Sequence, residues 1–134
     1  MKTFLRATAI IILFINAIGA LWGGGGFIYD PSGAYMQMPE GLLEPSPFTD
    51  YLIPGIILFI ANGLFSSYTL YLIFTRHSWY PRFIFLQGII LTMWISVQVG
   101  MLGVFYMPLH LPFFLMGVFL VIAGILLLKN APKP

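Results

Sequence analysis

Long hydrophobic runs separated by short polar segments dominate the chain. A helix that crosses the hydrocarbon core of a bilayer, about 30 Å thick, needs about 20 mainly apolar residues because its backbone amides must bond within the segment. Four segments meet this requirement: residues 4–22, 53–74, 83–102 and 109–128. The pattern predicts an all-α membrane protein, in which residues 1–134 form a single domain of four transmembrane helices packed as a bundle.

Composition supports this fold class. Of the 134 residues, 60% are hydrophobic and 7% are charged, whereas about 25% of an ordinary soluble domain is charged. These values exclude a water-soluble fold. The chain contains no cysteine, which excludes disulfides, thiolate metal sites and cysteine nucleophiles.

The charged residues divide by sign between the two sides of the predicted bundle. The basic residues on one side are Lys2, Arg6, Arg76, Arg82, Lys129 and Lys133. The acidic residues in the first loop are Asp30, Glu40, Glu44 and Asp50. Because Lys and Arg favour the cytoplasmic side, we expect both termini in the cytoplasm and the long first loop outside. The basic residues are few and scattered, so we expect the lipid bilayer, and no nucleic acid, as a partner.

The first hydrophobic segment has an alternative interpretation as a signal peptide. Lys2 and Arg6 precede an apolar run, and residues 17–19 form a permissible cleavage pattern. We expect the segment to be retained as a transmembrane helix.

The connection at residues 23–52 is the longest outside the spans. It opens with four glycines, contains a turn sequence at residues 30–33, and carries several apolar residues. We therefore expect it to fold back as a cap over the outer ends of the helices. Ser46 and Pro47 predict the start of a short helical turn that contains Asp50, followed by a kink or a restart of the helix near Pro54 and Gly55.

Small and polar residues recur at helical spacing and predict where helices pack. The aligned residues are Ala9, Asn16, Ala20 and Gly23 on the first span, Gly55, Asn62, Ser66 and Thr69 on the second, Thr92, Ser96, Gly100 and Gly103 on the third, and Gly117 and Gly124 on the fourth. Small residues let helix backbones approach closely. The stripe on the third span suits packing inside the bundle or across a dimer, and we expect self-association through Thr92, Ser96 and Gly100.

A second face of the third span carries Gln87, Trp94 and Gln98, which lie far from the aromatic belts. One interpretation is that these amides, with Asn16 and Asn62, bond to one another, each bond contributing about 0.6 kcal/mol. The other is that the five residues line a cavity for a lipid, a quinone or another mostly apolar molecule. Their predicted depths pair Asn16 with Gln98.

Ionisable residues are absent from the interior of every predicted span. This disfavours proton-coupled transport and charged-ion conduction. His110 could join the outer acids Asp30, Glu40, Glu44 or Asp50 in a metal or proton-transfer cluster, but their spacing matches no ligand signature. The alternative is that Asp30 and Asp50 cap a turn and a helix and that Glu40 and Glu44 are solvated. We expect no catalytic residue, no metal and no cofactor.

Residues 46–55 read Ser-Pro-Phe-Thr-Asp-Tyr-Leu-Ile-Pro-Gly, after the glycine run and the turn at 30–33 and before Arg76, His77 and the helix centred on Trp94. Over residues 19–103 the chain resembles a group of small uncharacterised bacterial four-helix membrane proteins that are loosely described as DoxX-like. The resemblance implies a four-helix fold in the bacterial cytoplasmic (inner) membrane and no established activity. Members often carry a carboxylate near the position of Gln98, so an amide there weakens a proton-linked role.

Three functional hypotheses follow. The first is a non-enzymatic integral membrane protein that acts as an accessory subunit or holds a small hydrophobic ligand, as a homo-oligomer or within a membrane complex. The second is a quinone- or lipid-linked membrane enzyme, by analogy with DoxX. The third is a passive channel or transporter for an uncharged solute.

Overall fold

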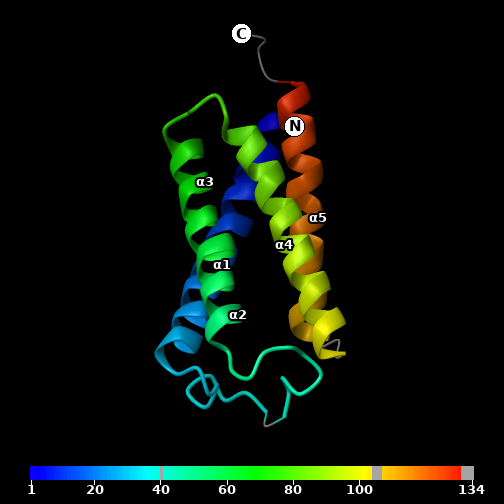
Figure 1. Ribbon diagram of the computed structural model, residues 1–134. Helices are drawn as coiled ribbons and strands as arrows, with labels where there is room; N and C mark the ends of the chain where they lie inside the picture. Colours follow the sequence, from blue (N-terminus) through cyan, green and yellow to red (C-terminus); the bar gives the residue numbers. More distant parts are fainter. Residues whose placement is uncertain (40, 104–106, 131–134) are drawn as a thin grey trace.

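The computed structural model describes residues 1–39, 41–103 and 107–130, and in these ranges the protein is helical without β-strands (Figure 1). The elements are α1 (Lys2–Tyr29), α2 (Leu52–Ile57), the π-helix η1 (Leu58–Leu64), α3 (Phe65–Phe74), α4 (Tyr80–Leu102) and α5 (Met107–Lys129). Because α2, η1 and α3 are continuous, they form one span, Leu52–Phe74. Four helices are therefore long and apolar enough to cross a membrane, as a multi-pass membrane protein requires.

The first helix is longer than the sequence predicts. We expected the loop to begin at Gly23, and this was wrong, because α1 continues through the glycine run to Tyr29. The reason is close packing between helices. A Cβ atom on Gly24 would lie 2.7 Å from the carbonyl oxygen of Gly55, so glycine is needed for α1 and α2 to approach this closely. Tertiary packing here outweighs the poor helix propensity of glycine.

The second span begins later than predicted. The helix does not start at Ser46: the Ser46 hydroxyl accepts a hydrogen bond from the Phe48 N–H at 3.2 Å, within a turn. The helix starts at Leu52, whose N–H donates to the Asp50 carboxylate at 3.0 Å. Pro54 falls in the first turn, where a missing N–H breaks no helical bond. This start lies close to the restart that we expected near Pro54 and Gly55, and the helix continues into the π-helix η1.

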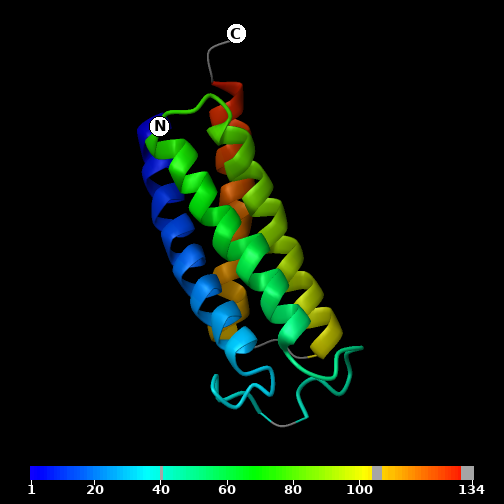
Figure 2. The ribbon, with the colours of Figure 1, turned by 60° about the vertical axis from the view of Figure 1, so that its left-hand side comes forward.

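The helices form two pairs. One pair is α1 with the continuous span α2–η1–α3, and the other is α4 with α5, which pack along their length (Figures 1 and 2). The pairs meet around a buried core at one end of the bundle. This core includes Leu5, Leu13, Leu70, Ile84, Leu120 and Leu127. Towards the other end α4 contacts η1, but α2 lies apart from α4.

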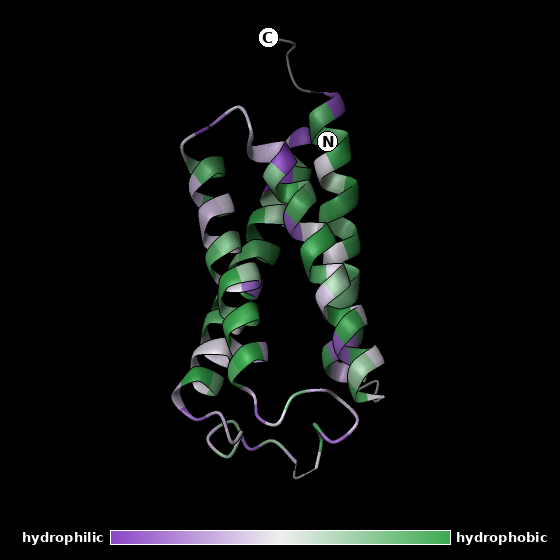
Figure 3. Ribbon diagram, viewed as in Figure 1, coloured by the Kyte–Doolittle hydropathy of each residue, from purple (hydrophilic) through white to green (hydrophobic). Residues whose placement is uncertain are grey.

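The two ends of the bundle differ in charge. The N-terminus, the turn between α3 and α4, and the end of α5 lie together, and we call this the terminal end; residues 30–51 form the loop end (Figure 1). The basic residues at the terminal end are Lys2, Arg6, Arg76, Arg82 and Lys129, and the acidic residues at the loop end are Asp30, Glu44 and Asp50. Glu40 and Lys133 lie outside the described residues. Hydrophilic positions gather at these two ends, whereas hydrophobic positions dominate the helices between them (Figure 3).

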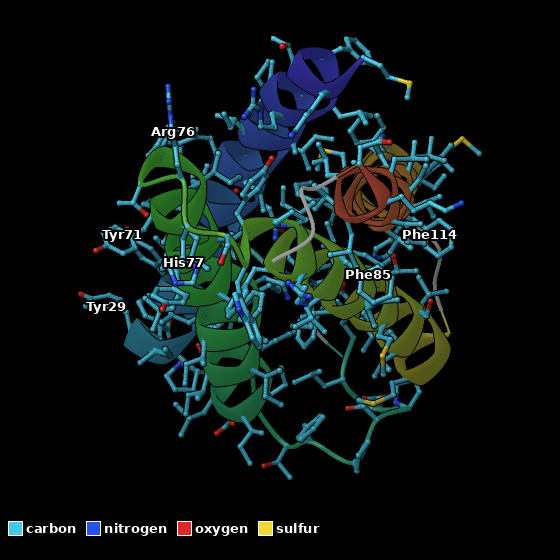
Figure 4. All side chains as sticks on the ribbon, turned by 90° about the horizontal axis from the view of Figure 1, so that it is seen from above. Tyr29, Tyr71, Arg76, His77, Phe85 and Phe114 are labelled. Carbon is cyan, nitrogen blue, oxygen red and sulfur yellow. The ribbon has the colours of Figure 1, made fainter. Side chains whose placement is uncertain are left out.

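The outward faces of the bundle are aromatic and apolar. Figure 4, viewed down the helices, shows Tyr29 and Tyr71 pointing away from the bundle, where they are 78% and 60% exposed. Side chains of this kind suit the interface and hydrocarbon regions of a bilayer.

Close approach between α4 and α5 depends on glycine. A Cβ atom on Gly124 would lie 2.6 Å from the backbone nitrogen of Phe85, and Gly117 lies against Thr92 and Gly88. The small-residue stripe expected on the third span is therefore divided. Its Thr92 contacts α5, but Ser96 and Gly100 are exposed, and Gly103 ends α4 in the left-handed conformation. Self-association through this stripe stays a prediction.

Candidate ligand-binding site

Four polar side chains form a closed hydrogen-bonded group inside the bundle, which we call the polar cluster: Asn16, Asn62, Ser66 and Gln87. The Asn16 Nδ2 donates to Ser66 Oγ at 2.9 Å and to Asn62 Oδ1 at 3.4 Å. The Ser66 hydroxyl donates to Gln87 Oε1 at 2.9 Å, and Gln87 Nε2 donates to Asn62 Oδ1 at 3.2 Å. The bonds link α1, η1, α3 and α4 into one ring.

The polar cluster is almost completely removed from solvent. Asn16 is 2% exposed and the other three side chains are 0% exposed. Since Asn62 Oδ1 accepts two bonds, the amide orientation is set, and Asn62 Nδ2 is left without a partner. Asn62 lies in the π-helix, where the changed register places it at the junction with α1 and α4. The cluster therefore holds the helices together and leaves little capacity for binding another molecule.

The predicted pairing of Asn16 with Gln98 was wrong. Asn16 bonds to Asn62 and Ser66, whereas Gln98 lies about three turns from Gln87 along α4. The error arose from the end of the first helix. Because α1 runs to Tyr29 and not to residue 22, Asn16 lies nearer the middle of its span than we expected.

A separate cavity of about 140 Å³ lies at the loop end, between α2, η1 and α4. We call it the loop-end cavity. Its walls from the helices and the N-cap of α2 are Phe27, Tyr51, Pro54, Ile57, Leu58, Trp94, Val97, Gln98, Met101 and Leu102. The connecting segment between α1 and α2, residues 30–51, contributes Met38, Leu43 and Phe48, which cover the cavity at the loop end. The apolar residues of this segment thus fold back over the helices, in the manner of the expected cap.

Three polar groups occur in these mainly apolar walls. Trp94 and Gln98 lie one turn apart on the same face of α4. Neither side chain makes a hydrogen bond to any residue that the structure describes. Tyr51 is 8% exposed and stacks on Phe27, with ring centroids 4.7 Å apart. Its hydroxyl is buried without a hydrogen-bond partner among the described residues, and burial raises the pKa of this phenol.

The connecting segment forms a second, outward-facing hollow of about 730 Å³. It shares Met38, Leu43, Phe48 and Tyr51 with the loop-end cavity, so these side chains separate the two spaces. The carboxylates of Glu44 and Asp50 line the hollow.

Asp30 and Asp50 have structural tasks. Asp30 accepts hydrogen bonds from the Ser32 hydroxyl at 2.7 Å, the Ser32 N–H and the Tyr35 N–H. The bond from the Ser32 side chain contributes most to lowering the pKa of the Asp30 carboxyl.

His110 is buried in the first turn of α5. Within residues 1–39, 41–103 and 107–130, no group of three or more His, Asp or Glu side chains is arranged to hold a metal ion.

Sequence reasoning missed two parts of this arrangement. Tyr51 was not among the predicted site residues and Ser66 was assigned to helix packing, yet Tyr51 lines the cavity and Ser66 bonds to Asn16 and Gln87 in the polar cluster. The apolar residues of the connecting segment were the available signal for the cavity roof. Ser66, one turn after Asn62, was the corresponding signal for the cluster.

Comparisons with family models, curated proteins and solved structures give no match to this chain, so its function is inferred from its own geometry.

Proposed function

We propose that this protein is a non-enzymatic integral membrane protein that holds a small, mainly apolar molecule in the loop-end cavity. The observation that carries the proposal is a cavity with apolar walls that contains Trp94, Gln98 and the buried Tyr51 hydroxyl, all without partners among the described residues. Binding pockets commonly combine apolar walls with a few placed polar groups.

The size of the cavity limits the occupant. Its volume of about 140 Å³ is close to the roughly 150 Å³ of an apolar cavity that binds benzene. The occupant is therefore one ring or a short chain segment of a larger molecule.

The proposed setting is a bacterial inner membrane, as the DoxX-like resemblance implies. The basic terminal end then faces the cytoplasm, and the cavity lies in the outer half of the bilayer. A protein of this kind would act as an accessory subunit or a carrier for the molecule that it holds, alone or as a homo-oligomer.

One observation favours a quinone- or lipid-linked enzyme as a second candidate. The hollow that carries Glu44 and Asp50 shares a wall with the cavity, so proton-exchanging groups lie near a bound molecule. If Glu44→Gln combined with Asp50→Asn leaves binding unchanged and the wild-type protein turns over no added quinone, the carboxylates have no catalytic task.

The polar cluster argues against a passive channel through a single chain. Its side chains are buried and bonded to one another across the middle of the bundle. They fill the position that a polar route between the two ends would need.

A cavity-filling variant tests the main proposal. Met101→Trp adds a large side chain to the wall of the cavity, whereas Met93→Trp makes the same change on the exposed face of α4. We expect fluorobenzene, followed by fluorine NMR in nanodiscs, to bind the wild-type and Met93→Trp proteins and to lose at least 80% of its bound signal with Met101→Trp. Absence of binding to the wild type, or equal binding to the two variants, would show that the proposal is wrong.

A further inference from the structure

The polar groups of the loop-end cavity differ from those of the polar cluster in what they offer. Trp94 presents an indole N–H, which can only donate a hydrogen bond. Gln98 presents an amide with two donor hydrogens and an acceptor oxygen, and Tyr51 presents a hydroxyl that is protonated at neutral pH and can donate as well as accept. All three groups can donate, and no carboxylate lines the cavity among the described residues.

The three residues come from two elements and line the same cavity. Trp94 and Gln98 lie at i and i+4 on α4, so their Cβ atoms are about 5–6 Å apart. Tyr51 reaches the same cavity from the N-cap of α2, where it is fixed by its stack on Phe27. The buried, unpaired Tyr51 hydroxyl is unfavourable in an apolar wall, and an acceptor on the occupant would remove that cost.

A carbonyl oxygen is the acceptor that fits this arrangement best. It has two lone pairs and can accept from two donors at once. It carries no hydrogen that would need an acceptor in the wall. The hydrogens of an amine or a cation could bond to the Gln98 or Tyr51 oxygen, but they would leave the Trp94 N–H, which can only donate, without an acceptor.

We propose that the loop-end cavity selects neutral molecules that combine a ring-sized apolar body with a ketone or ester oxygen, which accepts hydrogen bonds from Trp94 Nε1 and Gln98 Nε2. The inference rests on the proposed ligand-holding function and adds the chemical class of the ligand. The ester oxygen of a membrane lipid and the ketone oxygen of a free hydrophobic molecule share this chemistry.

Paired probes test the inference. In nanodiscs of ether lipids, which contain no carbonyl group, we would titrate 4-fluoroacetophenone and its oxygen-free analogue 1-ethyl-4-fluorobenzene and follow both by fluorine NMR. We expect the ketone to bind about tenfold more tightly, as two hydrogen bonds of ordinary strength would give. The infrared C=O stretch of the bound ketone should move to lower wavenumber.

Substitutions of Trp94 and Gln98 test whether these donors give the preference for the ketone. Trp94→Phe should remove most of the tenfold preference and the infrared shift, while the affinity for 1-ethyl-4-fluorobenzene stays within twofold. Gln98→Leu should remove part of the preference. Trp79→Phe is the matched control, since Trp79 is exposed at the terminal end, and it should leave the preference unchanged.

The outcomes separate the two proposals. Equal binding of both probes overturns the carbonyl inference and leaves the ligand-holding function intact, whereas binding of neither probe overturns both. A preference that survives both Trp94→Phe and Gln98→Leu also overturns the inference. Repeating the titration in ester-lipid nanodiscs identifies the source: competition supports a lipid ester as the occupant, and an unchanged affinity supports a free ketone.

Discussion

Gln87 and Gln98 lie on the same face of α4, yet their surroundings are opposite. Gln87 is fully buried and bonded to Ser66 and Asn62, whereas Gln98 lines a cavity and bonds to no described residue. The difference comes from the neighbouring span. Its α3 and η1 parts pack against α4, but α2 lies apart from α4. Whether an amide on α4 packs in the core or faces the cavity therefore depends on which part of the second span lies opposite it.

Small residues keep α1 and the second span close together along their length, so the second span follows α1 and not α4. At the level of the polar cluster, small residues such as Gly63 and Ser66 let α1 and the second span come close, and Gly63 packs directly on Leu21. At the level of the cavity, Gly24 still packs against Gly55 and the ring of Tyr51 stacks on Phe27, so α1 and α2 stay close while α2 lies apart from α4. Met38 and Phe48 line the resulting cavity at the loop end.

The contrast between Gln87 and Gln98 requires α4 and α5 to act as one rigid unit, and a substitution at Gly124 can disrupt their packing. Gly124→Leu should destabilise the protein by about 3 kcal/mol, because the new side chain meets the backbone of Phe85. The free energy of unfolding in mixed micelles with increasing SDS, followed by circular dichroism, measures the effect.

Gly100 supplies the matched control for this change. A Cβ atom on Gly100 would have nothing within 4 Å, so Gly100→Leu should be neutral or stabilise α4 by about 0.5–1 kcal/mol through its higher helix propensity. If the two substitutions had equal effects on a monomeric protein, the close approach of α4 and α5 would be refuted. A loss of stability with Gly100→Leu only in the associated protein would support self-association through this face.

The two glutamines give the most direct test of the comparison. Gln87→Leu should cost about 1–2 kcal/mol, because it removes two buried hydrogen bonds and leaves the Ser66 hydroxyl without an acceptor. Gln98→Leu should change the unfolding free energy of the empty protein by less than about 0.5 kcal/mol, since no bond is lost. Equal losses in the same SDS titration would contradict the distinction between a closed cluster and an open cavity.

The four spans could be predicted from the sequence because the bilayer fixes both the length and the hydrophobicity of a crossing helix. Details that depend on contacts between helices could not. The extension of α1 to Tyr29 depends on the packing of Gly24 against Gly55, and it changes the depth of Asn16.

Only some residues of the candidate site could be recognised in the sequence, and their grouping could not. Asn16, Asn62, Gln87, Trp94 and Gln98 form a single set in the sequence, because all are polar or amphipathic groups in apolar spans. Only the positions of the second span and the connecting segment divide them into a cluster and a cavity. A π-helix at Asn62 has no pattern in the sequence that announces it.

A smaller effect than that of Gln87→Leu is expected at the cavity hydroxyl of Tyr51. Tyr51→Phe removes a buried group that has no described partner, so the empty protein should gain about 1 kcal/mol of stability at pH 7. Burial raises the folded-state pKa of this phenol above its ordinary value of 10.0. Above pH 10 the phenol therefore ionises in the unfolded chain before it does so in the folded protein, and the wild type loses stability as the pH rises to the folded-state pKa. The stability advantage of Tyr51→Phe over the wild type should therefore grow above pH 10, as unfolding in SDS at pH 7, 9 and 10.5 can measure.

Tyr71→Phe, at an exposed position, is the control and should show neither the gain nor the additional pH dependence. A loss of stability with Tyr51→Phe at pH 7 would mean that the hydroxyl has a partner that stabilises the empty cavity.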